Sequence, residues 1–235
     1  MILLGIVATI LLPVLYSRVS NPVAIHWEVT RGQVPMPPKV YARAEIVGKM
    51  IPFGRVLALL TILVSFSATW GPPLKQTGWS MNSWATMLAG GAVVGICWLA
   101  MYCLILVQIP TARAQLSRHR FMTGSVAYWI SLNTTAAFVE EMWRGYCLTL
   151  LAGPGGIGAA GGLILSSVAF GLAHSRSMVR VGTTCLLAAV LGVLFLWGKS
   201  QWATVGAHMT VNIGTVLLVR TYAISTADGL IDPTK

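Results

Sequence analysis

Long apolar stretches alternate with short polar gaps along the whole chain. Each stretch is close to the roughly 20 residues that an α-helix needs to cross the hydrocarbon core of a bilayer. The gaps contain helix-breaking sequences, such as Gly71-Pro72-Pro73. The pattern therefore predicts an all-α membrane protein with about seven transmembrane helices. We place these helices at roughly 2–17, 52–70, 84–109, 124–150, 158–174, 179–197 and 203–222.

Two pairs of glycines are spaced so that both members of each pair share one face of a predicted helix. They are Gly91 with Gly95 and Gly158 with Gly162. Small residues four positions apart allow helix backbones to approach closely inside a membrane. We therefore expect these two helices to pack tightly against neighbours.

The composition also indicates a membrane protein, with much of its surface facing lipid. Of its 235 residues, 56% are hydrophobic and 9% are charged, whereas about a quarter of the residues in an average soluble domain are charged. The net charge of +10 comes from basic residues in the gaps, where they set membrane topology, so no nucleic-acid partner is expected. All four cysteines lie within apolar stretches without a CxxC pair, and we interpret them as small apolar side chains.

The basic residues of the gaps also predict an orientation. They concentrate in every second gap, most densely over 18–55, whereas the remaining gaps hold only Lys75 and Lys199. The positive-inside rule then places the N-terminus outside and the C-terminus in the cytoplasm. The segment 21–39, however, resembles an extracytoplasmic loop of the DUF1648 type, which would reverse this topology. The sequence leaves both orientations open.

Two acidic residues lie inside a predicted membrane helix. Glu140 and Glu141 follow the apolar segment 135–139, where a charged side chain costs about 2.5–3.5 kcal/mol even on the lenient insertion scale. Arg144 is four residues after the first and three after the second, so either carboxylate can share a helix face with it. The simplest interpretation is a structural ion pair between Glu141 and Arg144. One arginine does not balance two carboxylates, and the remaining carboxylate is a candidate base.

Two of the four histidines fall within or at the ends of predicted membrane helices. They are His174, four residues after Phe170, and His208, four residues before Asn212. Each pair therefore shares one helix face. A single histidine in a membrane helix is more often a packing residue than a catalyst. Two histidines, an asparagine and a spare carboxylate in successive helices instead indicate a polar site.

Three short motifs in successive helices carry a family resemblance. Residues 140–144 match EExxxR, residues 170–174 match FxxxH, and residues 208–212 match HxxxN. In this order the chain resembles the CAAX-protease and bacteriocin-processing (CPBP) family, also called type II CAAX or Rce1-like proteases. The resemblance divides the chain into N-terminal transmembrane helices at 1–123 with a basic loop at about 18–51, a CPBP-like catalytic helical core at 124–222, and a short polar tail at 223–235.

The resemblance implies hydrolysis of a peptide bond inside the membrane, in a membrane protein or peptide substrate. By motif position, Glu140 would act as general base on a water held with His174. His208 and Asn212 would donate hydrogen bonds to the oxyanion that forms. The family also implies an integral, multi-pass protein, which we assign to a bacterial cell membrane.

The remaining motif positions have supporting roles under the same resemblance. Glu141 would hold Arg144, and Phe170 would pack within its motif. The resemblance also allows a zinc ion, with a water as the fourth ligand, on Glu140, His174 and His208. The chain contains neither HExxH nor another closely spaced ligand pair, so we expect a reaction without metal or other cofactor.

Other functions remain as alternatives. The same polar groups could bind a peptide or partner in a catalytically silent immunity or scaffold protein. Glu140 and His174 could instead relay protons in a transporter, although the internal repeats typical of transporters are not evident. An aspartyl protease would require a membrane-embedded aspartate, and Ser166 and Ser167 lack a rhomboid-type GxSG setting.

Overall fold

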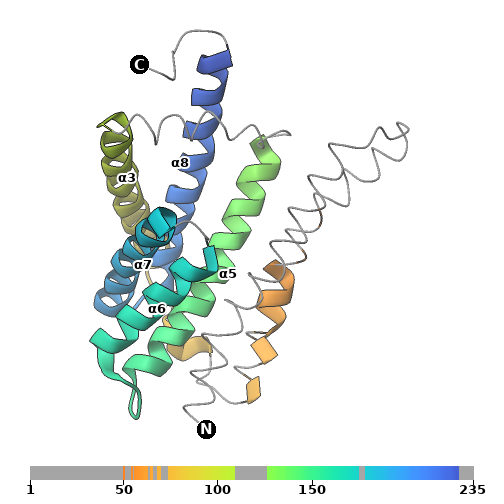
Figure 1. Cartoon of the computed structure of the whole chain (residues 1–235). Coiled ribbons are helices and arrows are strands. Elements are labelled where there is room, and N and C mark those ends of the chain that lie inside the picture. Colours follow the sequence, from red (N-terminus) through yellow and green to blue (C-terminus); the bar gives the residue numbers. More distant parts are fainter. Residues whose placement is uncertain are drawn as a thin grey trace, which may run out of the picture. The chain divides into compact units, whose positions relative to one another are not determined.

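The described part of the protein is helical. The computed structural model describes residues 74–108, 126–174 and 178–227, together with residues 50, 54, 56–62, 64–65 and 68–69. Within these residues there is no strand, which confirms the all-α prediction there. Figure 1 shows the helices η1 (Leu74–Thr77), α3 (Trp84–Gln108), α5 (Val126–Ala152), α6 (Gly158–His174), α7 (Met178–Gly198) and α8 (Gln201–Ala227).

Five of the seven predicted helices correspond to α3, α5, α6, α7 and α8. The stretch 52–70 is described only in part, and its described residues are helical. The stretch 2–17 and nearly all of the basic loop at 18–51 lie outside the described residues. The number seven is therefore not confirmed, and the domain boundaries and the orientation stay predictions.

Within the described residues, three helical segments are long and apolar enough to cross a membrane: Trp84–Ile105, Val181–Gly198 and Gln201–Thr221. Helix α6 is apolar but has only 17 residues, and α5 is long enough at 27 residues. The acidic pair, Arg144 and several amide and hydroxyl side chains lower the hydropathy of α5, which places it outside this group. The described helices are those of a membrane protein.

The chain forms two compact units. The first contains residues 1–79 and 142–201, and the second contains residues 80–141 and 202–235. Helix α5 runs through the boundary between Glu141 and Met142, and α8 enters the second unit at Trp202. The polar motifs are therefore distributed over both units.

In the second unit, α3 and α8 approach through glycines. A Cβ atom at Gly91 would overlap the backbone carbonyl group of Ala203, and one at Gly95 would lie 2.6 Å from the carbonyl oxygen of Ala207. From the opposite side, a Cβ atom at Gly206 would overlap the backbone of Leu88. Backbone meets backbone at these points, so the close packing predicted for Gly91 and Gly95 is confirmed.

In the first unit, α6 and α7 lie side by side (Figure 1). A Cβ atom at Gly171 of α6 would overlap the Cys185 side chain of α7. Gly162 packs against Leu151 at the end of α5. Gly158 has a positive φ of 81°, and a Cβ atom placed on it would meet no described atom within 4 Å. The close packing predicted for this pair is therefore correct for Gly162 and wrong for Gly158, which serves the turn into α6.

Candidate active site

Helix α5 presents two adjacent carboxylates in different environments. The side chain of Glu141 has no exposed surface, whereas that of Glu140 is 24% exposed. Adjacent residues of an α-helix point about 100° apart, so neighbours can face different surroundings. The two glutamates are therefore not equivalent: Glu141 is buried and Glu140 is partly exposed.

Helix α8 brings His208 to both carboxylates. His208 is buried, with Nδ1 at 2.8 Å from Oε1 of Glu141 and Nε2 at 3.7 Å from Oε2 of Glu140. The first distance is that of a hydrogen bond, and the second is longer than a direct hydrogen bond. One imidazole ring thus has a carboxylate on each of its two nitrogen atoms.

Asn212, which is four residues after His208 on α8, contacts α5 further from the carboxylates. Its Nδ2 atom lies 3.4 Å from the backbone oxygen of Asn133, while the Asn133 side chain donates to the backbone oxygen of Trp129. On α8 the order is His208 then Asn212, whereas their partners on α5 occur in the reverse order. The two helices therefore run antiparallel, and their facing sides carry two layers of polar contacts.

Aromatic rings hold the beginning of α8 in the same unit. Trp202 donates its indole N–H to the backbone oxygen of Ser80 at 2.9 Å. Its ring lies 5.9 Å from that of Trp84 and 6.2 Å from that of Phe138, in tilted arrangements typical of aromatic pairs. Phe138 precedes Glu140 by two residues, so these contacts fix α8 against α5 close to the carboxylates.

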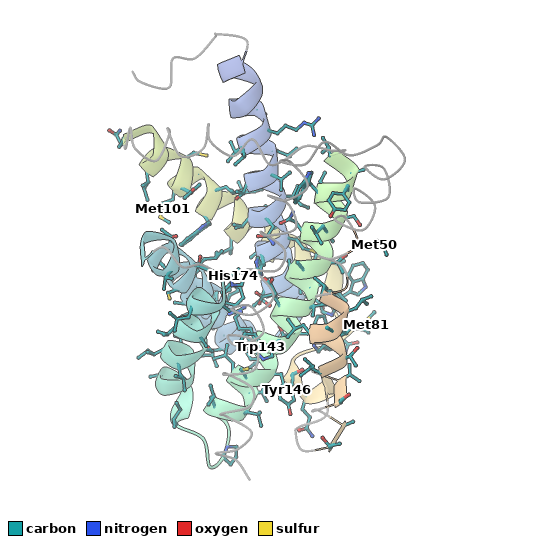
Figure 2. The ribbon with its side chains drawn as sticks, turned by 45° about the vertical axis from the view of Figure 1, so that its right-hand side comes forward. Met50, Met81, Met101, Trp143, Tyr146 and His174 are labelled. Atoms are coloured by element: carbon teal, nitrogen blue, oxygen red, sulfur yellow. The ribbon has the colours of Figure 1, made fainter. Side chains whose placement is uncertain are left out.

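Arg144 lies in the other compact unit and contacts α7. Its guanidinium Nη1 donates to the backbone oxygen of Ala188 at 3.0 Å, and the residue is 1% exposed. Its neighbours Trp143 and Tyr146, both labelled in Figure 2, are also buried. This contact was not predicted from the sequence, because a backbone acceptor leaves no motif. The Glu141–Arg144 ion pair stays a prediction.

His174 is the last residue of α6 and belongs to the same unit as Arg144. Its Nδ1 lies 2.8 Å from the backbone oxygen of Phe170, and its ring stacks on the Phe170 ring with the ring centroids 4.1 Å apart. Because a carbonyl oxygen only accepts hydrogen bonds, Nδ1 carries the proton and Nε2 of a neutral ring can accept one. Phe170 is buried and His174 is exposed, so the buried ring supports the exposed histidine of the same motif.

The structure thus brings together three of the residues predicted from the sequence, Glu140, Glu141 and His208, and places Asn212 in the next layer of contacts between α8 and α5. His174 lies in the other unit, and its place beside Glu140 stays a prediction. The sequence analysis did not identify Asn133 or the contact between Glu141 and His208. Among the residues that the structure describes, no three His, Cys, Asp or Glu side chains form a group able to hold a metal ion, and metal dependence likewise stays a prediction.

Comparison with known protein families gives a match to the second half of the chain. Residues 122–214 match the family model described as type II CAAX prenyl endopeptidase Rce1-like. No curated protein and no solved structure matches the chain. The matched segment starts just before α5 and ends two residues after Asn212, so it includes all three motifs. Residues 122–214 are therefore similar to an Rce1-like type II CAAX prenyl endopeptidase domain, which is consistent with the CPBP family predicted from the three motifs.

Proposed function

We propose that this protein is a multi-pass intramembrane endopeptidase of a bacterial cell membrane. It hydrolyses a peptide bond in a membrane-associated protein or peptide, without a metal or other cofactor. One observation carries the proposal. Two adjacent carboxylates of unequal exposure flank the two nitrogen atoms of one buried histidine, within the segment that matches a protease family.

Glu140 is the better placed of the two carboxylates to act on water. Its side chain is 24% exposed, whereas Glu141 has no exposed surface and accepts a hydrogen bond from His208. In the proposed reaction, Glu140 takes a proton from a water molecule as the water oxygen attacks the carbonyl carbon of the substrate. Such general-base assistance contributes about 10²–10⁴ in rate. We assign the second contact with this water to His174, whose Nε2 is the accepting nitrogen of a neutral ring.

The attack produces a negatively charged oxygen, which His208 and Asn212 are proposed to stabilise. Both residues point from one face of α8 toward α5. An amide group carries two N–H donors, so Asn212 can donate one to Asn133 and the other to the oxyanion. Removal of one such donor costs about 10²–10³ in kcat in a well-studied protease. The C–N bond then breaks as Glu140 returns its proton to the departing amine.

The proposal is tested by comparing peptide termini in membranes of cells that produce wild-type protein or Glu140→Gln at equal abundance. Termini that are present with the wild type and missing with Glu140→Gln would identify both the activity and the substrate. Asp232→Asn is the matched control, because it makes the same acid-to-amide change outside the family match and is expected to preserve the termini.

The contrary result is equally clear. If the termini are the same with wild type and Glu140→Gln while the biological effect of the protein is retained, the protein does not act as a Glu140-dependent protease. The polar groups would then serve the silent immunity or scaffold role, in which they bind a peptide or partner.

A further inference from the structure

We infer that Glu141 is a positioning residue for His208. It holds the imidazole ring so that a protonated Nδ1 donates a hydrogen bond to the Glu141 carboxylate and Nε2 lies on the side of Glu140. The catalytic meaning of this inference depends on the proposed function, but the hydrogen bond and the proton position do not. Glu141 would thus act through His208, in addition to any interaction with Arg144.

The first support is the geometry of the contact. Oε1 of Glu141 lies 2.8 Å from Nδ1 of His208, and the two side chains are 0% and 4% exposed. An ionised carboxylate has no proton to donate, so Nδ1 must supply the hydrogen. A charge-assisted hydrogen bond of this length, away from water, is among the stronger contacts in a protein. It fixes both which nitrogen is protonated and how the ring is rotated.

The second support is the difference between the two carboxylates. Oε2 of Glu140 is 3.7 Å from Nε2 of His208, and the Glu140 side chain is 24% exposed. At that distance the contact is electrostatic rather than a direct hydrogen bond. Of these two contacts, the one with Glu141 has hydrogen-bond geometry, so Glu141 is the carboxylate that orients the ring.

The arrangement restricts how His208 can assist the reaction. Because Nδ1 is committed to Glu141, a hydrogen bond to an oxyanion must come from Nε2. A ring that donates from both nitrogen atoms carries a positive charge. The carboxylates of Glu141 and Glu140 lie on opposite sides of such a ring, and buried charge is tolerated when it is paired in this way. The oxyanion role proposed for His208 therefore requires the doubly protonated ring.

Nitrogen-15 spectroscopy of histidine-labelled, full-length protein in detergent micelles tests the inference directly. The chemical shifts of imidazole nitrogens distinguish protonated from bare atoms, and His208→Gln identifies which signals belong to His208. We expect wild-type protein to show a protonated Nδ1 on His208. We expect Glu141→Leu, which has a similar size but no acceptor, to lose this preference.

Two further variants separate positioning from general disturbance. Glu141→Gln is expected to retain the protonated Nδ1, because its amide oxygen can still accept that hydrogen. Glu140→Gln is the matched control for the adjacent carboxylate and is also expected to retain it. In the assay of peptide termini, Glu141→Leu is expected to lose product, with Glu141→Gln restoring part of it.

A bare Nδ1 in wild-type protein would overturn the inference without reference to any variant, and so would a protonated Nδ1 that persists in folded Glu141→Leu. A protonated Nδ1 together with a bare Nε2 would support the positioning role and contradict donation by His208 to an oxyanion. Absence of proteolysis with the expected nitrogen signals would contradict the proposed function alone. Each failure is thus distinguishable from the other.

Discussion

Two neighbouring glycines of α3 provide a sharp test of how α8 is held. Gly91 is buried, and a Cβ atom there would overlap the carbonyl group of Ala203 on α8. Gly90 is exposed and has no neighbour within 4 Å of its own Cβ position. Replacing each in turn with alanine makes the same chemical change on the same helix. Only Gly91→Ala forces two backbones apart, so the pair isolates the effect of packing.

The expected magnitude follows from two opposing terms. Alanine is favoured over glycine in a helix by about 1 kcal/mol, and this term is common to both variants. Overpacking at Gly91 costs about 1–3 kcal/mol, since the atoms it meets belong to backbone rather than to a flexible side chain. The difference between the variants should therefore be about 1–3 kcal/mol. At roughly 2–4 °C per kcal/mol for a chain of this size, Gly91→Ala should melt about 2–12 °C below Gly90→Ala.

Thermal unfolding of the purified proteins in one detergent is the appropriate assay. Gly90→Ala is expected to unfold at or slightly above the wild-type temperature, and Gly91→Ala below it. Because α8 carries His208 and Asn212, Gly91→Ala should also reduce the yield of proteolytic termini. Equal melting temperatures for the two variants, or a lower value for Gly90→Ala, would refute the proposed close contact between α3 and α8.

Three further predictions concern the chemistry and the other compact unit. Asn212→Asp removes the amide donor at nearly constant size and should reduce the rate of product formation by about 10²–10³; an unchanged rate in a time course would remove Asn212 from the oxyanion site. A strong zinc chelator, 1,10-phenanthroline, should leave product formation intact, and inhibition that added zinc reverses would instead establish a metal enzyme. Gly192→Ala should melt below Gly182→Ala, because its Cβ would displace the end of the Leu163 side chain and lie 3.5 Å from Nη1 of Arg144. Gly182→Ala, which meets no atom within 4 Å on the same helix, is its control and should not melt lower than wild type.

Much of the helical architecture could be predicted because apolar length alone determines it. The stretch 158–174 coincides with α6, and the stretch 179–197 with α7 to within one residue at each end. The prediction was less accurate for α8, which begins two residues before 203 and continues past 222 to Ala227. Its first residue, Gln201, is polar yet fully buried. Hydropathy marks where a helix meets lipid, whereas intrahelical hydrogen bonds decide where it ends.

The partners of the site residues were harder to predict than the residues themselves. The spacing of Glu140, Glu141 and Arg144 along α5 favoured a contact within one helix, and that contact stays a prediction. The contact of Glu141 with His208 on α8 had no such signal in the sequence. Which of two adjacent carboxylates faces another helix depends on how α5 is rotated by its packing, and no local pattern reports this rotation. The partner of Asn212 is a backbone oxygen, which every residue possesses.

The pair of adjacent glutamates has a physical rationale in this arrangement. The two nitrogen atoms of imidazole lie on different edges of the ring, so a single histidine can contact two carboxylates only if they approach from different directions. Neighbouring residues on one helix turn satisfy this condition, since their side chains diverge by about 100°. The 2.8 Å contact of Glu141 and the 3.7 Å separation of Glu140 then follow from one helix facing one ring. Under the proposed function, two residues of identical chemistry then have different tasks: Glu141 holds the histidine and Glu140 acts on water. Exchanging either for its amide should therefore affect the reaction differently.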